Sequence, residues 1–186
     1  MAAEKEKVKK KKSALREWLE AIPIAILAAL IIRGFVVEAF KIPSGSMIPT
    51  LEIGDRIFVN KFIYRFREPR RGEIVVFKYP EDPKRYFVKR LVAKGGETVE
   101  IREGNIYIDG RLITEPEIFQ KIYYYNMGTY GAEGKVVKVP QGHYFFLGDN
   151  SPSSKDSRFW GFVPRKYIVG KAFLRFWPLW RIGLLR

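Results

Sequence analysis

The sequence predicts a mainly β fold: a twisted, partly closed antiparallel sheet with a small inserted β subdomain, preceded by one N-terminal transmembrane helix. Short runs rich in β-branched and aromatic residues follow one another from residue 51 onward, and convincing helical periodicity is scarce there. A long apolar run near the N-terminus predicts the helix. The 186 residues suffice for one compact domain with an appendage, but not for two full domains.

The N-terminal segment is a basic stretch followed by an apolar one. Lysines crowd residues 5–12, and residues 21–32 carry no charged side chain. Residues 18–40 are long enough to cross a hydrocarbon layer of about 30 Å. Because positive charge favours the cytoplasmic side, we expect a cytoplasmic tail at 1–17 and a single-pass anchor in the cytoplasmic membrane at 18–40, with the rest extracytoplasmic. A cleaved secretory signal and a buried or interfacial amphipathic helix remain alternatives.

The rest of the chain is predicted to consist of short strands separated by turns. A main β domain at 41–97 and 142–186 is interrupted by an inserted β subdomain at 98–141. Residues 114–135, rich in tyrosine and glycine, are expected to form a long exposed loop, in which the tyrosines either pack or form a binding surface. The predicted strands are 57–59, 74–77, 86–93, 99–101, 106–108, 112–113, 136–139, 144–147 and 167–173.

The C-terminal segment is apolar but broken by Pro178, so it is too short to span a bilayer. Its tryptophans and arginines fit either core packing or contact with a membrane surface.

The composition limits the classes of partner and cofactor. The net charge of +14 is spread over the whole chain, and such a field attracts nucleic acid or anionic lipid. No recognisable nucleic-acid motif accompanies it, so membrane lipid is the expected partner and nucleic acid is not. The absence of cysteine excludes disulfides and thiolate metal sites, and no cluster of metal ligands stands out. We therefore expect no metal or organic cofactor.

The stretch Pro-Ser-Gly-Ser-Met-Ile-Pro-Thr-Leu at residues 43–51 is the first candidate for chemistry. Its glycine allows Ser46 to be presented on a tight turn, with a backbone N–H free to face a substrate. A hydroxyl is a weak nucleophile unless a neighbouring base takes its proton. The chain has one histidine, His143, so the search for a base turns to Lys89. A triad of Ser46, His143 and Asp149 remains a formal alternative.

Lys89 can act as a base only if its amine is uncharged. Burial disfavours the ammonium, and catalysis needs a pKa of roughly 7–8 instead of about 10.4. Strand alternation places Phe87 and Leu91 on the face of Lys89, with Leu147 expected nearby, so the amine should be desolvated. Arg90 should point to the opposite face and pair with a carboxylate.

Five sequence boxes in order resemble the type I bacterial signal peptidases, membrane-anchored Ser–Lys serine endopeptidases that remove signal peptides from exported preproteins. The resemblance extends from about Trp18 to Phe176. The boxes are the serine stretch 43–51, Gly-Asp-Arg at 54–56, Arg-Gly-Glu-Ile-Val-Val-Phe at 71–77, Lys-Arg at 89–90, and Gly-Asp-Asn-Ser through Trp-Gly at 148–161.

The resemblance implies a role for each matching residue. Ser46 matches the nucleophile and Lys89 its general base, while Ser44 and the backbone N–H of Ser46 match the oxyanion donors. Substrates of the family carry small residues, typically alanine, at the first and third positions before the scissile bond. The remaining matches are Ser154, which orients the lysine, and the structural supports Asp149, Asp156 and Arg158.

Lys155 departs from the family pattern, which has a small or apolar residue there, and we expect its side chain to face outward. Two other functions remain in view. A self-cleaving regulator would use the same chemistry, but it needs an N-terminal DNA-binding domain that this sequence lacks. A membrane-tethered β scaffold without activity would be expected to have lost Ser46 or Lys89, and both are present.

Overall fold

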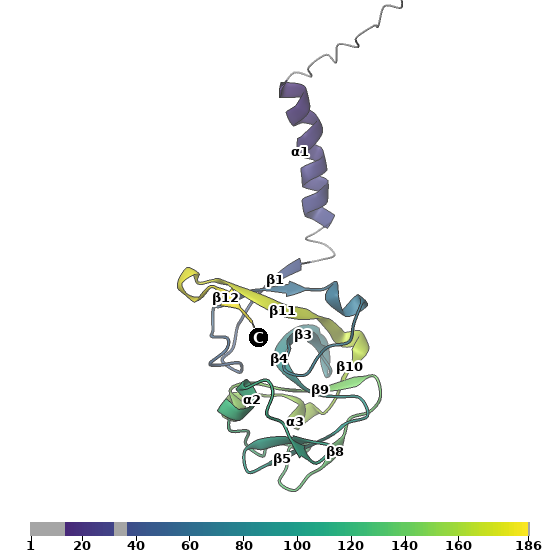
Figure 1. The fold of residues 1–186 in the computed structure, drawn as a ribbon, viewed down its shortest axis with the longest axis vertical. Helices are drawn as coiled ribbons and strands as arrows, with labels where there is room; N and C mark the ends of the chain where they lie inside the picture. The colour runs from purple at the N-terminus through teal and green to yellow at the C-terminus, as the bar shows by residue number, and fades with distance from the viewer. Residues whose placement is uncertain (1–13, 32–36, 186) are drawn as a thin grey trace, which may run out of the picture. The chain divides into compact units, whose positions relative to one another are not determined.

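The computed structural model describes residues 14–31 and 37–185, and the chain divides into two compact units, 1–36 and 37–186. Helix α1, Ala14–Ile31, belongs to the first unit (Figure 1). None of the helices within the described residues has both the length and the apolar character required to cross a bilayer. Residues 1–13 of the expected cytoplasmic tail lie outside the described residues.

The end of the expected anchor belongs to the β body instead. Residues 37–40 were expected to complete a helix, but Val37–Lys41 form strand β1, which pairs antiparallel with β2, Arg56–Asn60. Phe40 of this strand packs on the second core cluster and against the ring of Tyr86, at a centroid distance of 5.6 Å. Pairing and packing in the body thus decide the structure of a segment whose local apolar character resembles the preceding helix.

The body is built on a main antiparallel sheet, as the sequence predicts. Its strands follow the order β1-β2-β11-β3-β4-β9-β10, and β12 pairs with β11. The bounds of the strands beyond β1 and β2 are β3 Ile74–Tyr79, β4 Asp82–Lys94, β9 His143–Leu147, β10 Val163–Pro164, β11 Ile168–Trp177 and β12 Gly183–Leu184.

A second antiparallel sheet falls within residues 98–141 and has the order β7-β6-β5-β8. Its β5–β6 hairpin turns at Glu103 and Gly104, both with positive φ, as a two-residue hairpin turn requires. In Figure 1, β5 and β8 lie at the opposite end of the body from β1, β11 and β12. The strands are β5 Thr98–Arg102, β6 Asn105–Ile108, β7 Arg111–Leu112 and β8 Val137–Lys138.

The helices of the body are single turns. They are α2, Ile118–Lys121, and α3, Ser157–Trp160, accompanied by four short 3₁₀ segments at Ile63–Arg65, Ser151–Ser153, Arg165–Tyr167 and Leu179–Arg181.

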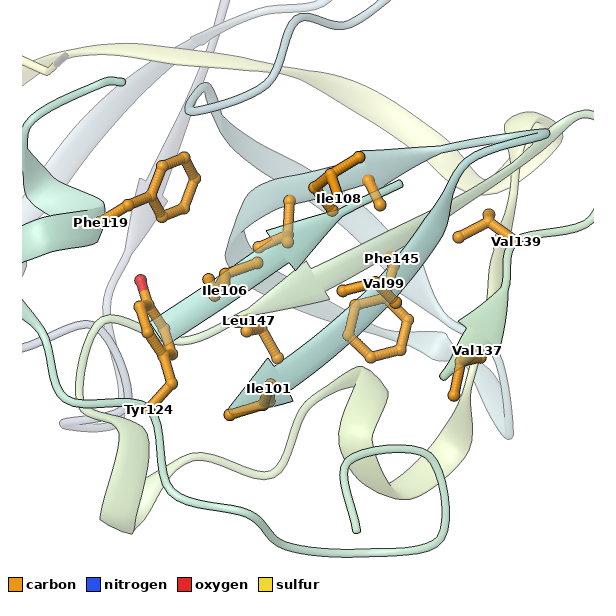
Figure 2. Close-up of a cluster of buried hydrophobic side chains, with 12 residues drawn as sticks. Val99, Ile101, Ile106, Ile108, Phe119, Tyr124, Val137, Val139, Phe145 and Leu147 are labelled. Atoms are coloured by element: carbon orange, nitrogen blue, oxygen red, sulfur yellow. The ribbon is translucent and has the colours of Figure 1, made fainter. Parts of the chain in front are cut away.

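The two sheets share a hydrophobic core. Phe145 and Leu147 of β9 pack with side chains of the β5–β6 hairpin, with Phe119 of α2 and with Tyr124. Figure 2 shows this cluster, with Ile101, Ile106 and Tyr124 gathered around one end of the hairpin. Burial of these apolar side chains from both sheets explains why the insert and the main sheet form one compact unit.

The C-terminal apolar segment is largely exposed. Leu185 is buried, but Trp180 is 83% exposed and four more apolar side chains of this segment are exposed. Core packing therefore accounts for Leu185 and not for the others, which are Trp177, Leu179, Ile182 and Leu184.

Candidate active site

Ser46 and Lys89 lie together in the structure although 43 positions separate them. Their Oγ and Nζ atoms are hydrogen-bonded at 2.5 Å. Ser46 belongs to a turn that follows β1, whereas Lys89 lies in the middle of β4. A hydroxyl at this distance can pass its proton to the amine only if the amine is uncharged. The protonation state of Lys89 therefore decides what the pair can do.

Lys89 is buried against apolar side chains. It is only 4% exposed, and the Phe87 ring centroid lies 5.6 Å from Nζ. Val75, which pairs with Lys89 between β3 and β4, belongs to the same core cluster as Phe87 and Leu91. Leu147 pairs with Arg90 instead and packs in the cluster between the two sheets, so it is not part of this wall.

Burial lowers the pKa of the Lys89 amine from its ordinary value of 10.5 to about 8. The cause is desolvation, which disfavours the charged form. The carboxylates of Asp156 and Asp149 act in the opposite direction, and the guanidinium of Arg158 adds to the lowering. With a pKa of about 8, about a tenth of the amine is neutral at pH 7 and about half of it at pH 8, which supplies the neutral form that a general base requires.

The backbone of the turn that carries Ser46 is held by Asn150. The Asn150 side-chain amide donates to the carbonyl of Gly45 at 2.9 Å, and its backbone N–H donates to the carbonyl of Ser46 at 3.1 Å. Met47, which follows the serine, is 2% exposed and packs in the second core cluster. The turn is therefore fixed on both sides of the half-buried Ser46.

Asp149 joins the serine stretch to the strand that carries Lys89. It accepts two hydrogen bonds from Arg90, at 2.8 Å and 2.6 Å, and one from the hydroxyl of Thr50 at 2.5 Å. Arg90 also donates to the carbonyl of Gly72 at 2.6 Å. The expected pairing of Arg90 with a carboxylate is thus confirmed. Because both partners are buried, removing either would leave an uncompensated charge.

Asp156 and Arg158 form a second buried ion pair. The carboxylate caps α3 by accepting from the backbone N–H of Arg158, and it accepts from the guanidinium at 2.8 Å through both of its oxygens. It also accepts from the N–H of Gly148 at 3.1 Å. A Cβ at Gly148 would overlap Ser154 Oγ and the carbonyl oxygen of Ser46, so this ion pair is connected directly to the backbone of the serine turn.

Ser154 and Ser44 lie at the site but make no side-chain hydrogen bond to Ser46 or Lys89 in the structure. Ser154 is buried, and its hydroxyl finds no hydrogen-bond partner among the described residues. The resemblance implies a bond from this hydroxyl to the Lys89 amine. In the structure the hydroxyl lies against Gly148 instead. Ser44 is exposed and lines the same groove as Ser46 and Lys89.

A groove of about 620 Å³ opens over the Ser46–Lys89 pair. It runs between the end of β1 and the first half of β4, and the serine turn forms part of its lining. Apolar side chains such as Phe87 and Met47 line it together with Tyr86. Its volume and its two flanking strands suit an extended peptide.

His143 and Lys155 do not take part in the pair. His143 begins β9, and its Nδ1 lies 3.0 Å from the carbonyl oxygen of Gln141. At about 3.3 Å per residue, His143 lies about 13 Å from Leu147, the last residue of β9, which precedes Gly148. The structure does not assemble a Ser46–His143–Asp149 triad, and Asp149 is engaged by Arg90. Lys155 faces outward as expected, with its side chain 61% exposed.

Sequence reasoning gave no role to Asn150, Thr50 or Gly148. All three belong to boxes that were noticed, and the Gly-Asp-Asn order is a typical turn signal in which short polar side chains hydrogen-bond nearby backbone. That signal indicates a turn here. It does not indicate that the turn would reach across 105 positions to the carbonyl of Gly45.

Comparison with known proteins gives a consistent picture. The family model described as signal peptidase, peptidase S26, matches residues 15–177. A probable signal peptidase I-2 from Synechocystis sp. is 44% identical over 191 residues, covering 97% of this chain and 84% of its own. A signal peptidase I from Leptolyngbya laminosa is 43% identical, covering 93% and 85% respectively. A signal peptidase I T from Bacillus subtilis is 40% identical, covering 91% and 89%.

Proposed function

This chain belongs to the peptidase S26 family of signal peptidases, and on that premise we propose that it cleaves preproteins with Ser46 as nucleophile and Lys89 as general base. It is a serine endopeptidase of the signal peptidase I type. Membership of the family sets aside the non-enzymatic scaffold and the self-cleaving regulator. The observation that supports the two roles is the 2.5 Å hydrogen bond between Ser46 Oγ and the buried amine of Lys89.

Acylation would begin with attack of Ser46 Oγ on the scissile carbonyl carbon. The neutral Lys89 amine takes the hydroxyl proton as the new C–O bond forms, and the carbonyl π pair moves to oxygen. The Ser44 hydroxyl and the Ser46 N–H would stabilise that oxyanion. When the C–N bond breaks, the Lys89 ammonium returns the proton to the leaving amine. Deacylation repeats the sequence with water, which Lys89 deprotonates.

Ser154, Asp149, Asp156 and Arg158 would act through the dyad. The buried hydroxyl of Ser154 lies next to Gly148 and the Ser46 backbone, and a buried hydroxyl is rarely left without a partner. We assign it the orienting role toward Lys89, although in this structure its hydroxyl makes no hydrogen bond to the amine. The carboxylates and the guanidinium support the loops around the dyad through their ion pairs.

The substrate would be the signal peptide of an exported preprotein, bound as an extended strand in the groove. Small residues at the first and third positions before the scissile bond would fill shallow apolar pockets that longer side chains would clash with. The enzyme would be anchored in the cytoplasmic membrane with its body extracytoplasmic. The basic and apolar N-terminal stretches support this, and so do the exposed apolar side chains of residues 177–184.

The test is cleavage of a labelled preprotein in detergent by the full-length protein and by Ser46→Ala. The wild type should release a fragment whose new N-terminus follows a small residue, with another small residue two positions upstream. Ser46→Ala should give no product while keeping the circular dichroism spectrum of the wild type. Normal turnover by this variant would eliminate Ser46 as the nucleophile.

The pH dependence tests Lys89 separately. Because the amine must be neutral, kcat/KM should rise about tenfold per pH unit below the pKa of Lys89 and level off above about pH 8. A rate that stays constant from pH 5.5 to 8.5 would contradict a lysine base, even if Ser46 proved essential.

A further inference from the structure

Residues 124–131, which we name the strap, cross from the insert to the loop that carries Ser154. Tyr124 begins the strap and is fully buried in the core between the sheets (Figure 2). Asn126 fixes it to β5, because its side-chain amide donates to the carbonyl of Ile101 at 2.9 Å. The same amide donates to the carbonyl of Gly131 at 3.1 Å, which closes the strap into a turn. The strap is therefore ordered by its own contacts with the second sheet.

The strap grips Arg158 through backbone groups at two places. The carbonyl of Tyr125 accepts a hydrogen bond from Arg158 Nη1 at 2.8 Å, and the N–H of Tyr130 donates to the carbonyl of Arg158 at 2.8 Å. These two contacts hold the guanidinium and the main chain of Arg158. They do not depend on the identity of the tyrosine side chains.

Two glycines allow this close approach. A Cβ at Gly128 would overlap the carbonyl oxygen of Arg158, and one at Gly131 would lie 2.5 Å from its Cγ. Contacts this short force one of the two segments to move. The glycines of the strap are thus explained by the proximity of Arg158.

Arg158 also hydrogen-bonds the loop that carries Ser154. Its Nη2 donates to the carbonyl of Ser151 at 2.7 Å and to that of Ser154 at 3.3 Å. The hydroxyl of Ser151 accepts from Arg158 Nη1 and from the N–H of Tyr125, both at 2.9 Å. One guanidinium therefore connects the strap to two residues of the loop.

The loop in turn meets the dyad. Asp156, paired with Arg158, accepts from the N–H of Gly148. A Cβ at Gly148 would overlap both Ser154 Oγ and the carbonyl oxygen of Ser46, so the loop and the serine turn approach each other closely at this glycine. The charged groups that act on Lys89 are Asp156 and Asp149, which favour its ammonium, and Arg158, which disfavours it. Two of these three groups belong to the ion pair that the strap holds.

We propose that the strap is a positioning element for catalysis: by gripping Arg158 it fixes the loop of Ser154 and the Asp156–Arg158 pair against the Ser46–Lys89 dyad. This inference rests on the dyad proposed above. It assigns a function to the tyrosine–glycine segment beyond exposed loop or binding surface. A displacement of about 1 Å at a catalytic constellation can cost two orders of magnitude in rate.

The test compares two glycines of the insert, Gly128 and Gly134, which share a φ of +67°. Nothing lies within 4 Å of a Cβ at Gly134, so Gly134→Ala carries the same backbone strain without the collision. Full-length Gly128→Ala should lower kcat/KM by about 10- to 100-fold relative to Gly134→Ala. Its pH–rate midpoint should also move, because displacing the Asp156–Arg158 pair changes the balance of the opposing charges that act on Lys89.

Rates are normalised to the folded fraction measured by circular dichroism, so a loss of stability alone does not count. Should Gly128→Ala fail to fold, Ser151→Ala removes the bridging hydroxyl without adding volume, and we expect about a 3- to 10-fold loss of kcat with a displaced midpoint. Equal kcat/KM and equal midpoints for Gly128→Ala and Gly134→Ala, or wild-type values for Ser151→Ala in its place, would overturn the role of the strap.

Ser46→Ala is assayed alongside to separate the two proposals. If that variant is active, the dyad fails and the strap has no dyad to position. If it is inactive while the two alanine variants at 128 and 134 behave alike, only the strap proposal is lost.

Discussion

Lys89 and Lys155 both line the groove and have contrasting surroundings. The amines of Lys89 and Lys155 lie 5.6 Å and 5.5 Å from the centroid of an aromatic ring, of Phe87 and Tyr79 respectively. Lys89 is 4% exposed and bonded to a hydroxyl, whereas the side chain of Lys155 is 61% exposed and lies 3.5 Å from a carboxylate oxygen of Glu81. Proximity to the groove and to an aromatic ring is thus common to both.

The contrast separates what makes a lysine a base from what merely places it near a substrate. Water and a carboxylate stabilise an ammonium, and an exposed ion pair of this kind contributes at most about 1 kcal/mol. An amine without water loses its charge more readily, and here desolvation brings the pKa of Lys89 to about 8. Burial, more than residue type or position along the groove, distinguishes the two.

The largest effect is expected on replacing the buried lysine. Lys89→Met keeps an unbranched chain of similar length in the apolar site but has no proton acceptor of comparable strength. We expect kcat/KM to fall by at least about 10³-fold, within the range that a positioned general base contributes. Steady-state cleavage of a preprotein at pH 8.5 measures this. Activity within tenfold of the wild type would mean that another group takes the serine proton.

Ser44 sharpens the comparison because it is exposed like Lys155 yet is assigned to the chemistry. Ser44→Ala should lower kcat by about 10²–10³-fold with little change in KM, the scale expected for loss of one oxyanion donor. The effect should be visible in single-turnover acylation as well as in the steady state. An unchanged kcat would show that Ser44 lines the groove without stabilising the oxyanion.

The burial of Lys89 should also have a cost in stability. At 1.36 kcal/mol per pH unit, lowering the pKa from 10.5 to about 8 corresponds to about 3 kcal/mol. The unfolded chain binds the extra proton, so this penalty is complete below pH 8 and disappears as the pH rises to about 10.5. Lys89→Met should therefore be more stable than the wild type by up to about 3 kcal/mol at pH 7.

Denaturant unfolding in detergent, followed by tryptophan fluorescence at pH 7 and pH 10.5, measures this gain. The difference between the two proteins should shrink at the higher pH. A gain of equal size at both pH values would show that it comes from packing and not from the charge.

The smallest effect is expected at the exposed lysine. Lys155→Met removes a surface ion pair with Glu81 and leaves the dyad untouched, so kcat/KM should stay within about threefold of the wild type. The midpoint of the pH–rate profile should not move. A large displacement of that midpoint would show that the charge of Lys155 reaches Lys89 through the groove, and the contrast between the two lysines would then be incomplete.

Much of the β body follows from local pattern, and so does the environment of the candidate base. Alternation along residues 86–93 predicted a buried Lys89 flanked by Phe87 and Leu91, and that burial is confirmed and lowers the pKa of the amine. The hairpin at Glu103 and Gly104 likewise joins two of the predicted strands, 99–101 and 106–108. These features depend on neighbours within a few positions, which a sequence displays directly.

Other features depend on partners far away in the chain. Strand β1 was missed because the predicted anchor extended through residue 40, whereas pairing with β2 makes residues 37–40 part of a strand. The two-residue strands β10 and β12 have no pattern of their own and exist through their neighbours. Leu147 was placed beside Lys89, but the register of β4 with β9 sets it opposite Arg90. Register between distant strands is a tertiary property that strand alternation leaves open.

The hold of Asn150 on both carbonyls of the Gly45–Ser46 turn has a consequence for the motion that a turnover requires. With the main chain of the turn fixed, the Ser46 oxygen can move only along the short arc traced by rotation about its Cα–Cβ bond. Leaving the amine, meeting a carbonyl carbon and later releasing an acyl group would all be positions on that arc. A serine restricted in this way loses little entropy on the approach to bond formation, because few of its torsions remain to be frozen.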